Sequence, residues 1–294
     1  MVHPRGSLIH PADFEPMPKS RQLEVHPPAI RVTGVPSVIG DLRLHPFQSR
    51  VFPTPRMLRV WLPPGYDDAE NAHRSYPVLY LNDGQNLFDE ATSFAGEWHA
   101  DAAADRLIRE SVIPAMILVG MDNATRERTR EYVPYRTLPN MLRVRGRHYP
   151  DFLTKEVMPF IARNYRVAQG PENTGLGGSS LGGLIALYTA IARPGLIGRL
   201  LLESPSLWVA GRKVVADAWR SSHWPLRVYV GVGTHELGRA DRNERVVRDV
   251  RDLERALRCS MGEDRLKVWI DEGTSHNESA WARRFPEALR FLYS

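Results

Sequence analysis

Several features that often assign a protein to a class are scarce in this chain of 294 residues. Cysteine occurs once, as Cys259. A single thiol can form no intramolecular disulfide and cannot supply a cysteine-rich metal site, so a disulfide scaffold and a zinc-finger type of domain are excluded. Cys259 follows an amphipathic segment, and we expect it to be a buried or partly buried thiol.

Long apolar runs are also missing. No segment approaches the roughly 20 apolar residues that cross a bilayer, so we expect no membrane partner. The first residues, M-V-H-P-R-G-S-L-I-H, contain no apolar run long enough for a signal peptide. On this ground we expect a cytoplasmic protein, unless a leader has been removed.

Lysine is rare too, with four residues among the 39 basic ones, and the formal net charge is +5. The basic residues are interspersed with Asp and Glu, most clearly over residues 242–258, where both signs fall on the solvated face of a predicted helix. No concentrated basic stretch and no RNA-binding aromatic motif is present. The sequence therefore predicts no nucleic-acid partner.

The chain divides into a proline-rich arm, residues 1–36, and one large domain, residues 37–294. Seven prolines and no sustained periodicity are typical of an arm that lies over the domain or a partner subunit, or is partly disordered. In the domain, expected strands alternate with expected helices. The strands cover residues 57–62, 77–81, 115–119, 199–202, 226–232 and 266–270. The helices cover residues 98–111, 150–165, 184–191, 211–221, 242–258 and 278–292.

This alternation indicates the fold class. Strands that alternate with helices form a mostly parallel central sheet with helices on both faces. Functional side chains then gather at the carboxyl ends of the strands. We therefore look for chemistry in the loops that follow the predicted strands.

The most informative motif is Gly178-Ser179-Ser180-Leu181-Gly182, which fits G-x-S-x-G. In this motif a serine occupies a sharp turn between a strand and a helix, where its hydroxyl is exposed as a nucleophile. Small residues flank the serine because the strand end and the helix start pack closely. Centring on Ser180 places glycine at both outer positions, whereas centring on Ser179 places Leu181 there. We predict Ser180 as the nucleophile.

A phosphate-binding loop fits these residues less well. No Lys-Ser/Thr pair follows the glycines, as a P-loop requires. A G-x-G-x-x-G pattern that starts at Gly175 would put Ser180 on its last glycine position. The nucleophile interpretation is therefore favoured.

A serine nucleophile needs a base and an acid. In a fold with this order of strands and helices, the acid follows the serine along the chain and the histidine follows the acid. His276 comes after the predicted strand 266–270 and before the last helix, and we predict it as the base. Glu236 follows the strand 226–232 and is the predicted acid, with Asp241 as an open alternative. His235 lies in the wrong place for the base.

The serine also needs N–H donors for the oxyanion that forms on the substrate. The backbone N–H of Leu181, directly after Ser180, is the first predicted donor. The loop after the strand 77–81 reads Asn82-Asp83-Gly84-Gln85, and we assign the N–H of Gln85 as the second. Gly84 lets the backbone approach the site closely.

Four segments together resemble the putative-esterase family of α/β-hydrolases: residues 80–88, 178–184, 204–208 and 275–276. The resemblance covers about residues 40–294. The family includes esterase D-like enzymes, feruloyl and acetyl-xylan esterases, enterochelin-type siderophore esterases and mycolyltransferases. The resemblance implies an α/β-hydrolase fold and serine-dependent ester chemistry.

The same resemblance points to substrate contacts. Residues 128–134, R-T-R-E-Y-V-P, resemble the R-x-x-E-Y-x-P stretch of the siderophore-esterase branch, where a basic residue near the cleft helps to hold the substrate. Carried over, Arg130 becomes a candidate substrate contact. Trp208 is a second candidate. Other aromatic residues are equally compatible with the pocket or the core: Trp98, Tyr132, Tyr135 and Trp281.

The motif order favours a serine carboxylic-ester hydrolase that acts through an acyl-enzyme on a small-molecule ester, such as an acyl, feruloyl, acetyl-sugar or siderophore ester. An acyltransferase on the same fold and a catalytically silent binding protein are the alternatives. We expect neither a metal nor an organic cofactor. The sequence leaves the substrate, and whether the chain forms a homo-oligomer, open.

Overall fold

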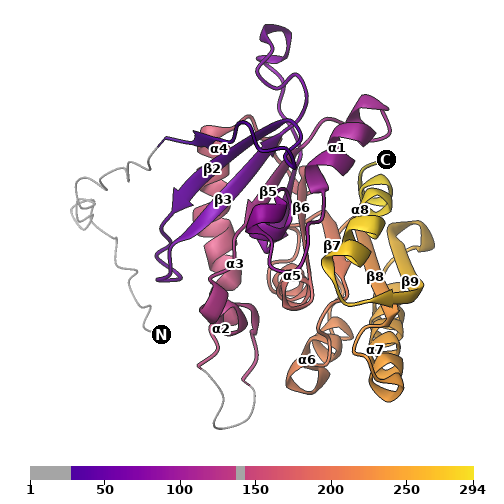
Figure 1. Cartoon of the computed structure of the whole chain (residues 1–294). Helices are drawn as coiled ribbons and strands as arrows, with labels where there is room; N and C mark the ends of the chain where they lie inside the picture. Colours follow the sequence, from indigo (N-terminus) through magenta and orange to yellow (C-terminus); the bar gives the residue numbers. More distant parts are fainter. Residues whose placement is uncertain (1–27, 137–142) are drawn as a thin grey trace, which may run out of the picture.

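The computed structural model describes residues 28–136 and 143–294, and in these residues the chain forms a single sheet between two layers of helices (Figure 1). The strand order is β1-β2-β3-β5-β4-β6-β7-β8-β9. The strands are Ile30–Arg31, Asp41–Phe47, Arg56–Leu62, Val78–Asn82, Ile117–Met121, Thr174–Ser179, Arg199–Glu203, Arg227–His235 and Leu266–Ser275.

The sheet is mostly parallel, as predicted. Every pairing among β4 to β9 is parallel, while β1, β2 and β3 pair antiparallel and β3 joins β5 antiparallel. All five residues of β4 and of β5 are buried, which explains their continuous apolar sequence. The carboxyl ends of β4, β6, β7, β8 and β9 therefore meet at one edge.

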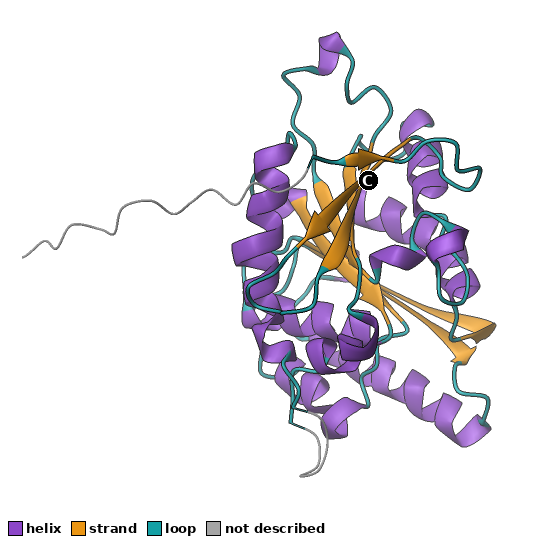
Figure 2. Ribbon diagram, turned by 60° about the vertical axis from the view of Figure 1, so that its left-hand side comes forward, coloured by secondary structure: helices purple, strands orange, loops and turns teal. Residues whose placement is uncertain are grey.

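Helices cover both faces of the sheet, as Figure 2 shows. Successive side chains of β4 alternate between two apolar clusters: Val78 and Tyr80 join one, Leu79 and Leu81 the other. The first cluster includes residues of α4, α5, α6 and α7 (Met158–Asn164, Leu181–Ala192, Val209–Ala218 and Ala240–Arg258). The second includes residues of α1 and α8 (Ala100–Arg109 and Glu278–Tyr293). The predicted α/β-hydrolase fold is confirmed.

Some element boundaries differ from the prediction. The expected helix 150–165 consists of α3 (Tyr149–Phe152), a π-helical turn (Leu153–Val157) and α4. The strands β8 and β9 run further than predicted, to His235 and Ser275. Their extra residues still pair, because a register shift between Gly233 and His235 lets His235 align with Ser275.

The N-terminal arm falls mostly outside the described residues, which begin at residue 28. Where it is described, Ile30 and Arg31 form β1 and pair with Leu44 and Arg43 of β2. The carbonyl of Ile39, just beyond the predicted boundary, accepts a hydrogen bond from Trp61 Nε1 at 2.7 Å. The division at residue 36 stays a prediction.

Cys259 corrects one expectation, because it is exposed. It occupies the C-cap position directly after α7, beyond the last buried residue of that helix, Leu257. Among the helices in the described residues, none combines the length and the apolar character needed to cross a bilayer.

Candidate active site

Ser180 occupies the turn between β6 and α5. Its backbone angles are φ 56° and ψ −121°, a conformation that costs free energy in a residue with a side chain. Its N–H donates to the carbonyl of Glu203 at 2.9 Å, which holds the turn against the end of β7. Ser179 is instead the last residue of β6 and is 4% exposed. The strained turn position thus belongs to Ser180.

The two glycines of the motif leave room for this turn. A Cβ atom at Gly182 would lie 2.9 Å from Asp83 Oδ2 and 3.0 Å from Asn82 Cβ, and one at Gly178 would lie 2.9 Å from Asn82 Cβ. The side-chain amide of Asn82 donates to the carbonyls of Gly177 and Gly182 at 3.2 and 2.9 Å. The end of β4 is therefore tied directly to the turn that carries Ser180.

His276 and Glu236 meet because their strands end side by side. The residues just before them, Ser275 and His235, are paired across β8 and β9. Nδ1 of His276 and Oε2 of Glu236 are 2.5 Å apart. An ionised carboxylate only accepts, so Nδ1 carries the hydrogen and Nε2 is left as the basic nitrogen.

Glu236 is held as a carboxylate. Burial would raise its pKa, but the hydrogen bond and charge of His276, with further donors from Ser204 and Gly233, lower it overall. Its Oε1 accepts from Ser204 Oγ and from the N–H of Gly233, each at 2.7 Å. Asp241 instead forms ion pairs with Arg239 and Arg245 on the surface. Of the two acid candidates, the structure brings Glu236 to His276.

The predicted oxyanion donors lie at two element starts. Leu181 is the first residue of α5, where helical N–H groups have no carbonyl partner within their own helix. Gln85 lies in a 3₁₀ turn, Gly84–Asn86, directly after β4. A Cβ at Gly84 would lie 2.6 Å from the carbonyl carbon of Gly120 and 2.7 Å from Met121 N, so only glycine fits there.

A cavity of about 760 Å³ lies over these groups. It is lined by Ser179, Ser180 and His276. Residues from the segments 83–86, 92–95 and 123–128 and from the start of α8 complete the lining. Ser180 Oγ lies 3.3 Å from Ser206 Oγ. The arrangement can carry out nucleophilic acyl transfer.

Comparison with known proteins agrees with this chemistry. The family model described as putative esterase matches residues 49–292. The chain belongs to the putative esterase family. It is therefore a carboxylic ester hydrolase, as the sequence predicted.

Individual relatives are distant from this esterase. The uncharacterized protein YbbA of Bacillus subtilis is 24% identical over 246 residues, which cover 81% of this chain and 92% of YbbA. The siderophore triacetylfusarinine C esterase of Aspergillus fumigatus is 29% identical over 157 residues, 52% of each chain. The structure of the siderophore hydrolase EstB from Aspergillus nidulans superposes with a TM-score of 0.67 at 18% identity, over 87% of this chain and 95% of EstB. The superposition supports the fold.

Two residues that we predicted as substrate contacts, Arg130 and Trp208, do not line the described cavity. The guanidinium of Arg130 pairs with Glu127 at 3.0 Å, and Arg130 is absent from the lining of the described cavity. Arg126 and Arg128 line it instead. Trp208 is 60% exposed and also absent from that lining. Residues two apart on a helix face different sides, which is why Arg128 and Arg130 of α2 (Arg128–Tyr132) diverge.

Arg128 secures the loop after β4. Its Nε and Nη2 donate to the two carboxylate oxygens of Asp83 at 2.7 and 2.8 Å, and Asn123 adds a third donor at 2.7 Å. Asp83 adopts a left-handed conformation, φ 59° and ψ 49°, directly before Gly84 and Gln85. Arg128, and not the predicted Arg130, is the arginine at the first position of R-x-x-E-Y-x-P.

The other aromatic candidates divide between the cavity and the core. Trp281 lines the cavity and packs edge-on against His276, with ring centroids 5.1 Å apart. Trp98 packs behind it and is 2% exposed, and Tyr132 is 1% exposed. The hydroxyl of Tyr135 donates to Asp217 at 2.9 Å. In the described residues, no group of three or more His, Cys, Asp or Glu side chains is arranged to hold a metal ion.

We expect Arg128→Gln to lower kcat about tenfold with 4-nitrophenyl acetate, because Asp83 loses its bidentate partner and the loop that carries Gln85 loosens. The sequence prediction for Arg130 is tested by Arg130→Gln in parallel. Its pair with Glu127 is only partly buried, so we expect a change of less than about threefold. Steady-state kinetics at fixed ionic strength measures both, and a larger loss in the Arg130 variant would contradict this assignment.

Proposed function

We propose that the esterase is a serine hydrolase that cleaves a small-molecule carboxylic ester through an acyl-enzyme. The observation that carries the proposal is the convergence on one cavity of a strained Ser180 and of His276, whose Nδ1 is 2.5 Å from the Glu236 carboxylate. A nucleophile, a base and an orienting acid are the groups that such a reaction requires.

In the proposed reaction, Ser180 Oγ attacks the ester carbonyl while Nε2 of His276 takes the hydroxyl proton. The N–H groups of Leu181 and Gln85 stabilise the oxyanion of the tetrahedral intermediate. The C–O bond to the alcohol then breaks, and His276 returns the proton to the leaving alkoxide. Water attacks the acyl-enzyme by the same route, which releases the carboxylic acid and restores Ser180.

The cavity and the similar proteins support the proposed substrate class. A cavity of about 760 Å³ has the volume of a small-molecule site. Two of the similar proteins are named as a siderophore triacetylfusarinine C esterase and a siderophore hydrolase. We propose a small-molecule ester of the acyl, feruloyl or siderophore type as the substrate.

A fluorophosphonate probe tests the mechanism directly. We expect it to modify Ser180 in the folded protein, because the probe reacts with a serine whose proton a neighbouring base accepts. Peptide mass spectrometry locates the adduct, and heat-unfolded protein is the matched control. A product assay with 4-nitrophenyl acetate, with and without methanol, separates hydrolysis from acyl transfer. Labelling that is absent, or equal in unfolded protein, would contradict the proposal.

A further inference from the structure

Ser204 is a buried serine at the end of β7, outside the groups that the proposed reaction uses. It is 2% exposed and has a backbone φ of 42°, which is unusual for a residue with a side chain. Its N–H donates to the carbonyl of Gly231 on β8 at 2.7 Å. An unusual conformation persists where the surrounding contacts hold it in place, so Ser204 has a fixed position beneath the cavity.

The hydrogen bonds of Ser204 give its hydroxyl a fixed direction. Trp281 Nε1 donates to Ser204 Oγ at 3.0 Å, and Arg284 Nη2 makes a longer contact of 3.4 Å with the same oxygen. Both partners can only donate, so they occupy the acceptor side of the hydroxyl. Its single hydrogen is therefore left for Glu236 Oε1, at 2.7 Å.

These contacts form a closed network of four side chains: His276, Glu236, Ser204 and Trp281. His276 Nδ1 donates to one oxygen of Glu236, Ser204 Oγ donates to the other, and Trp281 donates to Ser204. The Trp281 ring then packs against the imidazole with an interplanar angle of 86°. The network joins the ends of β7 and β8 to the loop after β9 and to α8.

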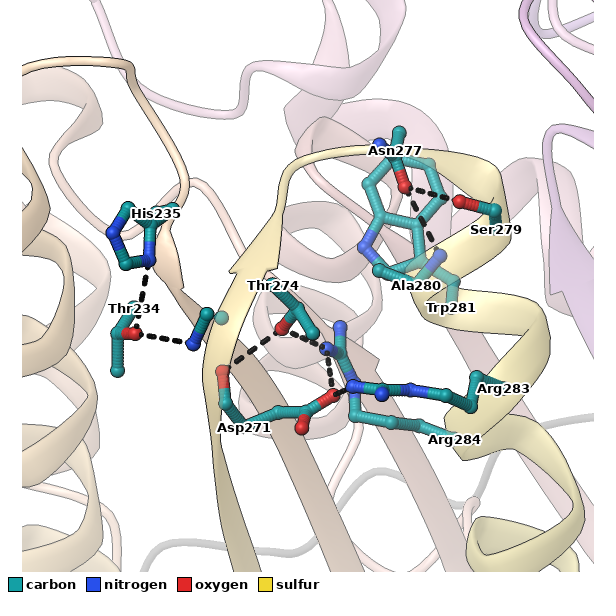
Figure 3. Close-up of polar contacts among 12 residues, drawn as sticks. Thr234, His235, Asp271, Thr274, Asn277, Ser279, Ala280, Trp281, Arg283 and Arg284 are labelled. Carbon is teal, nitrogen blue, oxygen red and sulfur yellow. Dashed lines mark hydrogen bonds and ion pairs between the residues drawn. The ribbon is translucent and has the colours of Figure 1, made fainter.

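Arg284 contacts this network through Ser204. It is fully buried and donates to Glu203 Oε2 through Nε and Nη2, at 2.9 and 2.7 Å. Its Nη1 contacts Asp271 at 3.2 Å, and Figure 3 shows Arg284 reaching Asp271 from the helix that also carries Trp281. Glu236 is thus bonded to His276 and lies near the charge of Glu203, which Arg284 pairs.

We infer that Ser204 is a positioning residue: together with Trp281, its hydroxyl fixes the Glu236 carboxylate and, through it, the orientation of His276. The inference rests on the proposed serine mechanism and deepens it. Ser204 does not touch the reacting atoms. Its contribution therefore falls on the chemical step more than on substrate binding.

The test compares Ser204→Ala, Trp281→Phe and the double variant in turnover of 4-nitrophenyl acetate. We expect Ser204→Ala to lower kcat about tenfold and to leave KM within about twofold. Because Ser204 acts through Glu236, adding Ser204→Ala to Glu236→Gln should lower kcat by no more than about a further twofold. The double variant of Ser204→Ala and Trp281→Phe should have a kcat no more than about twofold below that of the less active single variant. Both changes act through the hydrogen bond from Ser204 to Glu236.

Ser49→Ala is the matched control. Ser49 is also a buried serine that donates to a glutamate, Glu156 at 2.5 Å, but it does not line the cavity. We expect this variant to melt at a lower temperature with kcat unchanged. A full tenfold further loss from Ser204→Ala in the Glu236→Gln background, or a loss of kcat that Ser49→Ala matches at equal melting temperature, would overturn the inference while wild-type labelling at Ser180 upholds the mechanism. Absence of that labelling would overturn both.

Discussion

Ser180→Ala is expected to lower kcat with 4-nitrophenyl acetate by at least about 10³-fold, because the nucleophile is removed and no acyl-enzyme can form. Alanine keeps the Cβ atom, so the strained turn at φ 56° should be retained and the melting temperature should stay close to that of the wild type. Circular dichroism melting and steady-state kinetics measure the two quantities.

Ser179→Ala is the control for this substitution. Ser179 ends β6 with 4% exposure, so its loss should cost less than about tenfold in kcat. The fluorophosphonate adduct should remain on Ser180 in that variant. A Ser179→Ala protein with the larger loss would show that the neighbouring serine carries the reaction.

Glu236→Gln should reduce kcat by about 10³- to 10⁴-fold. The amide removes the negative charge that stabilises the imidazolium of His276 in the transition state, and its NH₂ group can face Nδ1 and favour the wrong tautomer. The pKa of Glu236 is lowered in the folded protein, so the carboxylate is ionised at neutral pH and the effect should be fully present there.

Asp241→Asn distinguishes the two acids that the sequence left open. Asp241 pairs with Arg239 on the surface, so its substitution should change kcat by less than about threefold. Each variant replaces a carboxylate by an amide of nearly the same size, so the two values of kcat compare the loss of charge at the two positions. Comparable losses in the two variants, or a loss confined to Asp241→Asn, would contradict the role of Glu236.

Much of the fold followed from local pattern. The apolar run at 77–81 and the alternation of strands and helices are consequences of burial on one or both faces of a sheet, and burial leaves a periodic trace in the sequence. The G-x-S-x-G motif identified a turn because glycine at positions 178 and 182 is a steric requirement of that turn. Such constraints act between residues close in the chain.

Contacts between distant segments could not be predicted in the same way. The choice between Glu236 and Asp241 depends on the register shift that aligns His235 with Ser275, a property of two strands together. Arg128 rather than Arg130 reaches Asp83 because of the direction in which α2 presents its side chains. Ser204 lies just after a predicted strand and within the segment 204–208 that carries the family resemblance, and these two signals pointed to a place in the site.

Sequence pattern alone predicted the α/β class and the serine-bearing turn, because these rest on periodic burial and on local sterics. The predicted order of acid and histidine along the chain followed from the order of elements in such a fold. The tertiary structure decided which acid contacts His276, which arginine holds the loop after β4, and that Trp208 and Cys259 face solvent. It also joined Ser204 and Trp281 to Glu236. Those contacts depend on how strand ends and helix faces meet across the sheet, which no local pattern encodes.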